Sequence, residues 1–226
     1  MAARISIVIP TLNAATSLPR CLHALMEGLG QGLIREVIVS DGGSHDQTVA
    51  IAQAAGARVV TGAPSRGGQL RRGCSAASGQ WLLVLHGDTV LAPGWALVVA
   101  DHIDGAAGGA AYFRLEFDAG GAKARFVAGW ANLRARLFGL PYGDQGLLVR
   151  RDDYDRVGGY PDWPLMEDVA LVRKLGWSVA LPATARTSAG RYLRDGWVRR
   201  GARNLWTLAR YFSGADPDQL AKTYRR

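Results

Sequence analysis

The first half of the chain alternates short apolar runs with segments in which apolar residues recur every three or four positions. The apolar runs are β-branched or aliphatic and end at turn-forming or polar residues, which predicts buried strands over residues 5–9, 36–40, 58–61 and 81–85. Helical periods predict helices over residues 15–28, 45–55, 69–77 and 93–103. Because parallel strands need long crossover connections, this alternation predicts a parallel sheet with helices on both faces.

The pattern becomes less regular after Gly109. Residues 111–117 alternate between two faces, residues 122–138 and 167–175 have helical periods, and residues 146–149 form a short apolar run. No internal repeat, low-complexity tract or Pro/Ser-rich linker separates the two halves. We therefore predict an α/β fold with a Rossmann-like, mostly parallel sheet and a mixed second half. It forms one domain over residues 1–190, followed by a helical segment over residues 191–226.

The composition is that of a globular protein. The 226 residues are 48% hydrophobic and 20% charged, which excludes wholesale disorder. Two cysteines, Cys21 and Cys74, are too few for a disulfide framework or a multi-cysteine zinc site. No apolar run approaches the roughly 20 residues of a membrane-spanning helix, and the run before Pro10 is too short for a secretory signal. These features predict a cytoplasmic protein.

The formal net charge of +8 is concentrated at the C-terminus. Nine basic and three acidic residues lie between Arg191 and Arg226, so this segment carries +6 and the first 190 residues carry +2. Uniform basicity would favour nucleic acid as the partner. A basic terminal segment instead leaves a membrane surface, a protein partner or an anionic substrate open, and we expect no nucleic-acid partner.

The basic segment also contains an amphipathic pattern. One apolar helical face is formed at spacings of four and three by Val198, Ala202, Leu205, Ala209 and Phe212, and arginines surround it. This pattern predicts a helix that lies in the plane of a membrane and brings the protein to a lipid-linked acceptor at the inner face. The alternative is a C-terminal helix packed on the domain.

Three of the predicted strands end in polar and glycine residues. These ends contain Pro10, Thr11 and Asn13, then Asp41, Gly42 and Gly43, and then His86 and Asp88. Ligands of open parallel sheets bind at the carboxyl ends of the strands, so these residues predict a polar ligand there. The Asp41 carboxylate either accepts a hydrogen bond from a base or ribose or caps its own turn.

Two further segments carry candidate chemistry near the same edge. His86 and Asp88 have a spacing that suits a divalent cation shared with diphosphate oxygens, although a hydrogen-bonded turn is the commoner explanation. Residues 65–73 join a glycine-rich turn to a basic helix start, where Arg66, Arg71 or Arg72 can meet phosphate, or form a solvated helix face. The chain has neither a Walker loop nor a Gly-x-Gly-x-x-Gly turn after the first strand.

The acidic pair Glu167 and Asp168 opens the last helix predicted before residue 190. Acidic residues in a first helical turn are ordinary partners of the helix dipole. A carboxylate at the ligand edge is also suited to act as a general base. Both interpretations remain open on these residues alone.

Four motifs in sequence order resemble the family-2 glycosyltransferases. They are Ile5–Asn13, Val37–Ser44, Leu83–Thr89 and Met166–Leu171, and the resemblance extends over about residues 4–190. It implies a glycosyltransferase A fold and a nucleotide-diphosphate sugar donor. It also implies a divalent cation, Mn²⁺ or Mg²⁺, and inverting transfer to a hydroxyl acceptor.

The resemblance also assigns roles to individual residues. Asp168 matches the acid that serves as catalytic base, and Asp88 matches the second acid of the metal-binding Asp-x-Asp motif, whose first acid is replaced here by His86. The nucleotide-sugar pocket would contain Pro10, Thr11, Asn13, Asp41, Gly42, Gly43, Arg66, Gln69 and Asp88. The acceptor side would contain Asp144, Gln145 and Glu167. Because the Gln-x-x-Arg-Trp motif of processive members is absent, the resemblance implies single transfer.

The short length, the His86-Gly-Asp88 variant, the segment Tyr142–Gln145 and the arginine-rich tail are most similar to a small bacterial subgroup. That subgroup is labelled as associated transferases, sometimes with arsenosugar biosynthesis. Two other classes remain as alternatives. A nucleotidyltransferase usually carries a glycine-rich basic loop after the first strand, and residues 11–15 are not such a loop. A non-catalytic binding module would use the basic tail alone.

Overall fold

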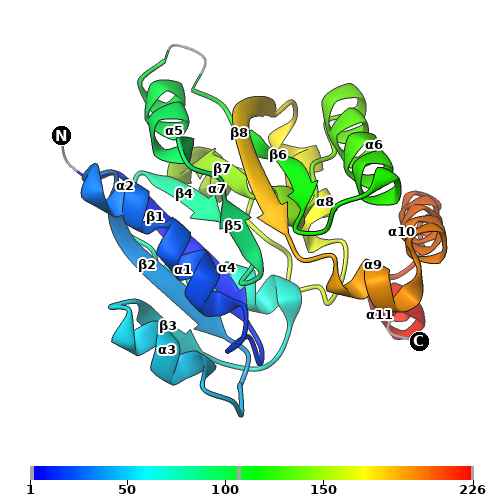
Figure 1. Cartoon of the computed structure of the whole chain (residues 1–226), viewed down its shortest axis with the longest axis horizontal. Helices are drawn as coiled ribbons and strands as arrows, with labels where there is room; N and C mark the ends of the chain where they lie inside the picture. The colour runs from blue at the N-terminus through cyan, green and yellow to red at the C-terminus, as the bar shows by residue number, and fades with distance from the viewer. Residues whose placement is uncertain (1–2, 106–107, 225–226) are drawn as a thin grey trace.

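The computed structural model describes residues 3–105 and 108–224, so Arg225 and Arg226 of the basic tail lie outside the described residues (Figure 1). The strands are β1 (Ile5–Thr11), β2 (Ile34–Asp41), β3 (Arg58–Thr61), β4 (Trp81–Val84), β5 (Thr89–Leu91), β6 (Ala111–Phe117), β7 (Leu147–Arg150) and β8 (Val179–Thr187). The helices of the first half are α1 (Leu18–Ala24), α2 (Met26–Gly30), α3 (Thr48–Ala54), α4 (Arg66–Ala76) and α5 (Trp95–Asp104). Those of the second half are α6 (Ala122–Phe138), the 3₁₀ turn η1 (Gly143–Gln145), α7 (Arg151–Arg156), α8 (Glu167–Leu175), α9 (Gly190–Asp195), α10 (Trp197–Phe212) and α11 (Pro217–Tyr224).

The strands form one sheet in the order β3-β2-β1-β4-β7-β6-β8-β5. β1 pairs in parallel with β2 and β4, and β2 pairs in parallel with β3. β7 is antiparallel to both β4 and β6, β8 is parallel to β6, and β5 is antiparallel to β8. The prediction of a parallel first half and a mixed second half is therefore confirmed.

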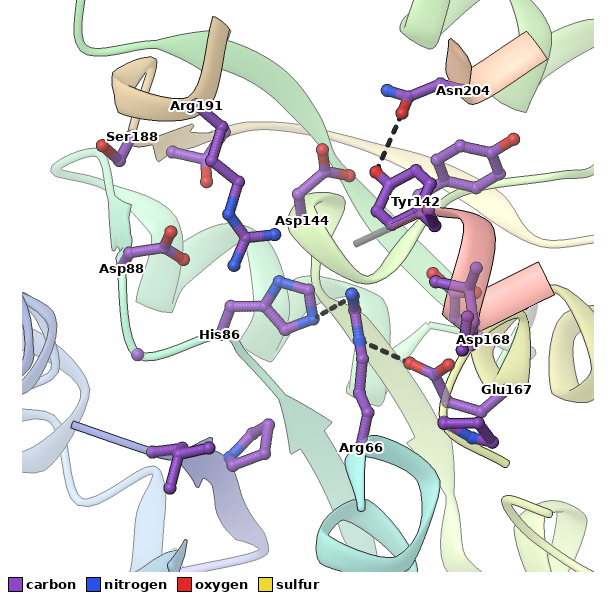
Figure 2. A pocket seen from close by; sticks show the side chains of 18 of the residues that line it. Arg66, His86, Asp88, Tyr142, Asp144, Glu167, Asp168, Ser188, Arg191 and Asn204 are labelled. Atoms are coloured by element: carbon purple, nitrogen blue, oxygen red, sulfur yellow. Dashed lines mark hydrogen bonds and ion pairs between the residues drawn. The ribbon is translucent and has the colours of Figure 1, made fainter. Parts of the chain in front are cut away.

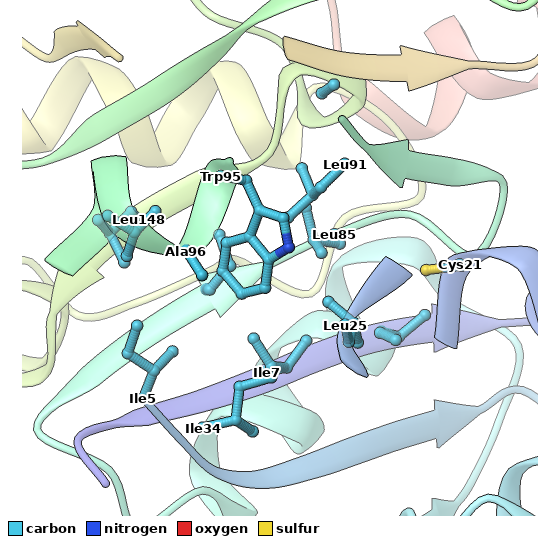
Figure 3. Close-up of a cluster of buried hydrophobic side chains, with 14 of the residues drawn as sticks. Ile5, Ile7, Cys21, Leu25, Ile34, Leu85, Leu91, Trp95, Ala96 and Leu148 are labelled. Carbon is cyan, nitrogen blue, oxygen red and sulfur yellow. The ribbon is translucent and has the colours of Figure 1, made fainter. Parts of the chain in front are cut away.

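The side chains of β1 enter two separate cores, one on each face of the sheet. Ile5, Ile7 and Ile9 pack with α1 and α5 in the first core, and Figure 3 shows Ile5 and Ile7 there. Val8 points to the other face, where α4, α7 and α8 pack with α11. A strand buried on both faces has no polar side to show, which explains the near-continuous apolar run of this segment.

Trp95 is the largest fully buried side chain of the first core. Its indole Nε1 donates a hydrogen bond of 3.0 Å to the carbonyl oxygen of Ala24, which joins α5 to α1. The ring occupies space that any side chain at position 28 would fill, because a Cβ added to Gly28 would lie 2.6 Å from Trp95 Cη2. The tight packing of α2 on α5 therefore depends on a glycine at this position.

The predicted elements agree with the structure most closely where a clear period and clear end signals coincide. α6, α8, β3 and β6 begin and end at the predicted residues. The helix expected over residues 15–28 is divided at Leu25 into α1 and α2. α4 begins three residues earlier than expected, because the Ser65 hydroxyl caps its first turn by accepting from the backbone N–H of Gly68.

β8 escaped prediction because its pattern is interrupted. Pro182 has no amide hydrogen, and the ladder between β6 and β8 shifts register between Tyr112 and Arg114. Tyr112 is opposite Ala180, whereas Arg114 is opposite Thr184. The sequence of β8 therefore lacks a strand-like period because the sheet itself is irregular there.

The C-terminal helices pack on the second core with an unexpected orientation. α11 contributes the buried Leu220 and Ala221. α10 turns its polar side inward, with Arg200 and Thr207 buried, and leaves the predicted apolar face exposed. The helix is therefore packed on the protein, as the alternative interpretation held, but through the side opposite to the predicted apolar face. None of the helices in the described part of the chain has the length and apolar composition needed to cross a membrane.

Replacing Trp95 by Ala should lower the free energy of unfolding by about 3–5 kcal/mol, because the substitution leaves a cavity and removes the bond to Ala24. Chemical denaturation followed by fluorescence measures this loss. Leu97→Ala on the same helix is the control, since Leu97 is 61% exposed and should change stability by less than about 1 kcal/mol. Equal effects of the two substitutions would contradict the packing described here.

Candidate active site

A cavity of about 910 Å³ lies at the carboxyl ends of β1 and β4. Its walls come from these strand ends, the start of α4, the turn η1, the start of α8 and the helices α9, α10 and α11. Figure 2 shows carboxylates, a histidine and two arginines that converge on this space from separate elements. The cavity therefore lies at the edge where the sheet topology predicts a ligand.

Ten of the predicted site residues line this cavity. They are Pro10, Thr11, Asn13, Arg66, Gln69, His86, Asp88, Asp144, Glu167 and Asp168. The lining does not include Asp41, Gly42, Gly43 or Gln145. The sequence thus predicted most of the side chains that come together, and two of the remaining four, Asp41 and Gln145, hold the local backbone in place.

Asp41 braces the loop that follows β2. Its buried carboxylate accepts hydrogen bonds from the hydroxyls of Thr11 and Ser44 and from the backbone N–H groups of Gly43 and Ser44, at 2.6–2.9 Å. Burial alone would raise the pKa of this carboxyl, but these bonds, those from Ser44 first, bring it below its usual value. Asp41 therefore caps its own turn, and the expected ligand contacts of Asp41, Gly42 and Gly43 stay predictions.

Gln145 is fully buried beneath the cavity. Its side-chain nitrogen donates to the carbonyl oxygen of Phe113 and to Asn132 Oδ1, and its oxygen accepts from the backbone N–H of Tyr142. These bonds fix the turn η1 to β6 and α6. Gln145 thus holds in place the turn that carries its neighbour Asp144, and its expected contact with an acceptor stays a prediction.

Gln69 also joins strand ends. Its side-chain nitrogen donates to the backbone carbonyls of Thr11 at 2.6 Å and Ser40 at 3.1 Å, so it ties the end of β1 to that of β2. On the neighbouring loop, Asn13 accepts a bond from the backbone of His45 and donates its own N–H to Ser44 Oγ. These contacts hold one wall of the cavity in place.

The Arg66 side chain bridges two sides of the cavity. Its Nε lies 2.6 Å from Glu167 Oε1, and its Nη2 lies 3.0 Å from Nε2 of His86 (Figure 2). Because a guanidinium can only donate, the His86 Nε2 must accept, so the imidazole is neutral and carries its proton on Nδ1. Burial, together with the positive charges of Arg66 and Arg191, lowers the pKa of His86 well below its usual value.

Two carboxyl groups of the cavity, the buried Glu167 and the half-buried Asp144, resist ionisation. Burial raises the pKa of Glu167 to about 7, against the opposing effect of Arg66. Burial likewise raises the pKa of Asp144, whose Oδ1 has no hydrogen-bond partner among the described residues. Such an acceptor is available to a ligand hydroxyl.

Asp168 is partly exposed, whereas its neighbour Glu167 is fully buried. Its Oδ2 accepts from the backbone N–H of Gly143 at 2.8 Å, and its Oδ1 accepts from the backbone N–H of Val169 at 2.7 Å. Each oxygen keeps a further lone pair, so the carboxylate is fixed in position and still able to accept a proton. This arrangement meets the geometric requirement for a general base that faces a cavity.

Two wall residues have backbone conformations that side chains rarely adopt. Asn13 has a φ of 51° and Met166 has a φ of 64°, and both line the cavity. Met166 directly precedes the pair Glu167 and Asp168, so its left-handed conformation starts α8 at this point. Such strain, typically about 1–3 kcal/mol per residue, is common at functional sites.

The C-terminal helices contribute a hydrogen-bonded wall that sequence reasoning did not foresee. Asp195 pairs with Arg200, Arg200 donates to the Tyr224 hydroxyl, and that hydroxyl donates to Asn204. Asn204 in turn donates to the hydroxyl of Tyr192. These hydrogen bonds connect α9, α10 and α11 along the cavity. The spacing of the polar residues within positions 192–204 was the sequence signal that could have predicted them.

Four arginines complete the same wall. Arg191, Arg194, Arg199 and Arg203 line the cavity, and within residues 3–105 and 108–224 none of them forms an ion pair. Arg191 lies above His86, on the side of Asp88 (Figure 2). Part of the positive charge of the tail therefore faces the cavity, where it would attract an anionic ligand.

The donor set near Asp88 suits a divalent cation only in part. The described residues contain no group of three His, Cys, Asp or Glu side chains arranged for a metal. Mg²⁺ bound to phosphates needs only one or two protein carboxylates, and Asp88 can provide one. The lone pair of His86 is directed at Arg66, so in this arrangement it does not offer a ligand.

The raised pKa of Glu167 gives a testable dependence of stability on pH. Its ordinary value is 4.5, so the folded protein holds this proton more tightly than the unfolded chain does. Relative to Glu167→Gln, the wild-type free energy of unfolding should fall by on the order of 1–3 kcal/mol as the pH rises from 4.5 to about 7. Chemical denaturation at several pH values measures the difference, and a flat or rising difference would contradict the buried environment.

Comparison with known proteins identifies the family. The model of glycosyl transferase family 2 matches residues 6–150, more than half of the chain. A PGL/p-HBAD biosynthesis glycosyltransferase of Mycobacterium bovis is 37% identical over 93 residues, which are 38% of this chain and 36% of the relative. A protein of the same name from Mycobacterium tuberculosis matches equally. The chain thus matches only about a third of the length of these curated relatives.

Solved structures show the same fold. Glucosyl-3-phosphoglycerate synthase of Mycobacterium tuberculosis, in complex with Mn²⁺, uridine diphosphate and phosphoglyceric acid, is 24% identical with a TM-score of 0.58 and covers 82% of this chain and 69% of its own. S. aureus TarS is 14% identical with a TM-score of 0.62 and covers 91% of this chain and 64% of its own. The predicted glycosyltransferase A fold is confirmed, and the chain belongs to glycosyl transferase family 2.

Proposed function

We propose that the protein is an inverting glycosyltransferase that moves one sugar from a nucleotide-diphosphate donor to an acceptor hydroxyl. The observation that carries this proposal is the convergence of Asp88, Asp168 and Arg191 on one cavity at the carboxyl edge of the sheet. Family membership supports the transferase class over a nucleotidyltransferase or a non-catalytic binding module. The finer subgroup, including its arsenosugar label, stays a prediction.

Asp168 is the proposed general base. Its position, fixed by two backbone N–H groups, lets the carboxylate take the proton from the acceptor hydroxyl while the hydroxyl oxygen bonds to the anomeric carbon. The bond to the donor diphosphate breaks on the opposite side of the sugar. A single displacement of this kind inverts the anomeric configuration. We propose one transfer for each binding event, in line with the missing processive motif.

The donor would lie along the wall formed by the ends of β1 and β4. Pro10, Thr11, Asn13 and Gln69 line that wall and would surround the nucleoside. The solved relative with bound UDP-glucose and Mn²⁺ supports a nucleotide-sugar donor. Asp41 would hold the shape of the pocket from behind, through its bonds to Thr11 and Ser44.

Negative charge that gathers on the leaving diphosphate needs a positive surrounding. Arg191 faces this region together with Arg194, and neither forms an ion pair among the described residues. A divalent cation, Mn²⁺ or Mg²⁺, would be held by Asp88 and the diphosphate oxygens, and it would supply further charge stabilisation. Because Nε2 of His86 accepts a hydrogen bond from Arg66, that nitrogen would not bind the cation in this arrangement.

The acceptor would enter from the side of Asp144, Glu167 and the C-terminal helices. The unpartnered Oδ1 of Asp144 is suited to accept from an acceptor hydroxyl. We propose a lipid-linked acceptor, reached at the inner face of the membrane through residues 191–226, which complement the catalytic domain of residues 1–190. The two buried free thiols are in keeping with a cytoplasmic, reducing compartment.

Replacing Asp168 by Asn should leave donor binding intact and lower kcat by roughly 10²–10⁴-fold, because the amide cannot accept the proton. A mass-spectrometric screen of nucleotide sugars identifies the donor that the wild type consumes, and the variant is then assayed with it. Asp101→Asn on α5, which removes a carboxylate outside the cavity lining, is the matched control. Full activity of the Asp168 variant would overturn the assignment of the base.

Asp88 should couple donor binding to the cation. With UDP and Mn²⁺ together, the thermal midpoint of the wild type should rise by more than it does with either ligand alone. The Asp88→Asn variant should lose the additional rise that Mn²⁺ causes and keep the rise caused by UDP. Differential scanning fluorimetry measures both effects. An additional rise that survives the substitution would show that another group holds the cation.

A further inference from the structure

An exposed apolar stripe runs along α6. Phe126, Trp130, Leu133 and Leu137 follow one another at spacings of four, three and four, which places them on one face of the helix. Their side chains are between 42% and 77% exposed. Phe138, at the end of the helix, is also exposed. This helix was predicted as an element of the fold, but its pattern gave no indication of an uncovered face.

A second exposed stripe runs along α10. Val198, Leu205 and Phe212 lie on the face already identified by its spacing, between 45% and 80% exposed, and Trp206 adjoins them at 66%. The opposite side of the same helix lines the cavity with Arg203, Asn204 and Thr207. The exposed face therefore lies directly behind one wall of the proposed active site.

The two stripes are parts of one region of the molecule. α6 and α10 contact each other and lie at the same end of the protein (Figure 1). Trp177 adjoins the end of α6 near Gly139, and Leu193 is exposed on the neighbouring α9. Of the sixteen large hydrophobic side chains that are exposed among the described residues, eleven belong to this region. Such clustering marks an interaction surface, because single apolar residues are normally scattered.

The charges on these helices are all of one sign. α6 and α10 contain no acidic residue and eight basic ones. Arg134 and Arg200 are buried, and Arg199 and Arg203 line the cavity, so four remain on the outer surface: Lys123, Arg125, Arg136 and Arg210. Exposed tryptophans next to basic side chains are typical of helices that lie at the boundary between lipid headgroups and acyl chains.

We propose that α6 and α10 together form a docking surface for an anionic lipid bilayer, with Trp130, Trp177 and Trp206 at the headgroup level. A second copy of the chain fits this surface poorly. A symmetric dimer through these helices would bring their positive charges together, and the helices hold no acidic partner for them. Anionic headgroups supply the missing negative charge, and the acyl boundary accommodates the apolar side chains.

The proposed membrane contact involves two helices, α6 and α10, and it determines how the cavity is oriented relative to the bilayer. Because α10 has one side on the cavity and the other on the bilayer, docking would place the acceptor wall within a helix diameter of the lipid surface. The docking itself does not depend on sugar transfer. Only the delivery of a lipid-linked acceptor rests on the proposed function.

Flotation with lipid vesicles tests the surface. The full chain should float with vesicles of phosphatidylcholine and phosphatidylglycerol, float much less with phosphatidylcholine alone, and lose binding as salt increases. The double variant Phe126→Ser with Trp130→Ser on α6 should lower the partition coefficient about tenfold or more, and Leu205→Ser with Trp206→Ser on α10 should do the same. Leu29→Ser with Leu97→Ser, equally exposed but on α2 and α5, should have no effect.

The outcomes separate this proposal from its competitors. Unchanged flotation of the α6 variant, with a loss confined to the α10 variant, would overturn the two-helix surface. A wild-type dimer that becomes a monomer in the α6 variant, without vesicle binding, would show a second copy as the occupant. Binding of an oligonucleotide in place of vesicles would also overturn the proposal. Thermal midpoints with UDP and Mn²⁺ show whether each variant keeps its fold and donor site, independently of any transfer activity.

Discussion

The guanidinium of Arg66 is the contact on which the geometry of the cavity depends. It joins the start of α4 to the end of β4 through His86 and to the start of α8 through Glu167. A partly buried cation stabilises this arrangement only while both neighbours accept from it, so His86 must stay neutral. The same contact explains why position 143 is a glycine, since a Cβ there would lie 2.5 Å from His86 Nε2. Gly143 in turn donates its N–H to Asp168.

The parallel half of the fold could be predicted because burial on both faces makes β1 and β4 near-continuous apolar runs, and β2 contains the shorter apolar run Val37–Val39. β5 could not, since three residues carry no period, and β8 was hidden by Pro182 and the register shift beside it. The candidate site shows the same limit. Strand-end polarity indicated where side chains gather, but Asp88 and Asp41 look alike in sequence, and only the folded loop shows that Asp41 serves its own turn.

The basic tail contains α10, whose arginines lie on different sides of the helix. Its sequence showed a positive charge and an apolar face, and both pointed toward docking. In the structure, the Arg200 side chain pairs with Asp195 and donates to the Tyr224 hydroxyl, whereas Arg203 lines the cavity. The direction of each arginine depends on how α10 rotates against α6 and α11, and a single sequence does not fix that rotation. Part of the positive charge of the tail therefore lines the cavity, and part lies on the outer surface of the protein.

The cavity combines two carboxyl groups of raised pKa with arginines that form no ion pair among the described residues. Glu167 is buried and Asp144 is half-buried, and burial raises the pKa of both carboxyls. The positive charge of Arg66, and for Asp144 also that of Arg134, acts in the opposite direction. An anionic diphosphate that enters the cavity would be attracted by Arg191, Arg194 and Arg203, which line it. Its most favourable position is therefore on the side of Arg191, which leaves the side of Asp144 and Asp168 to a neutral hydroxyl.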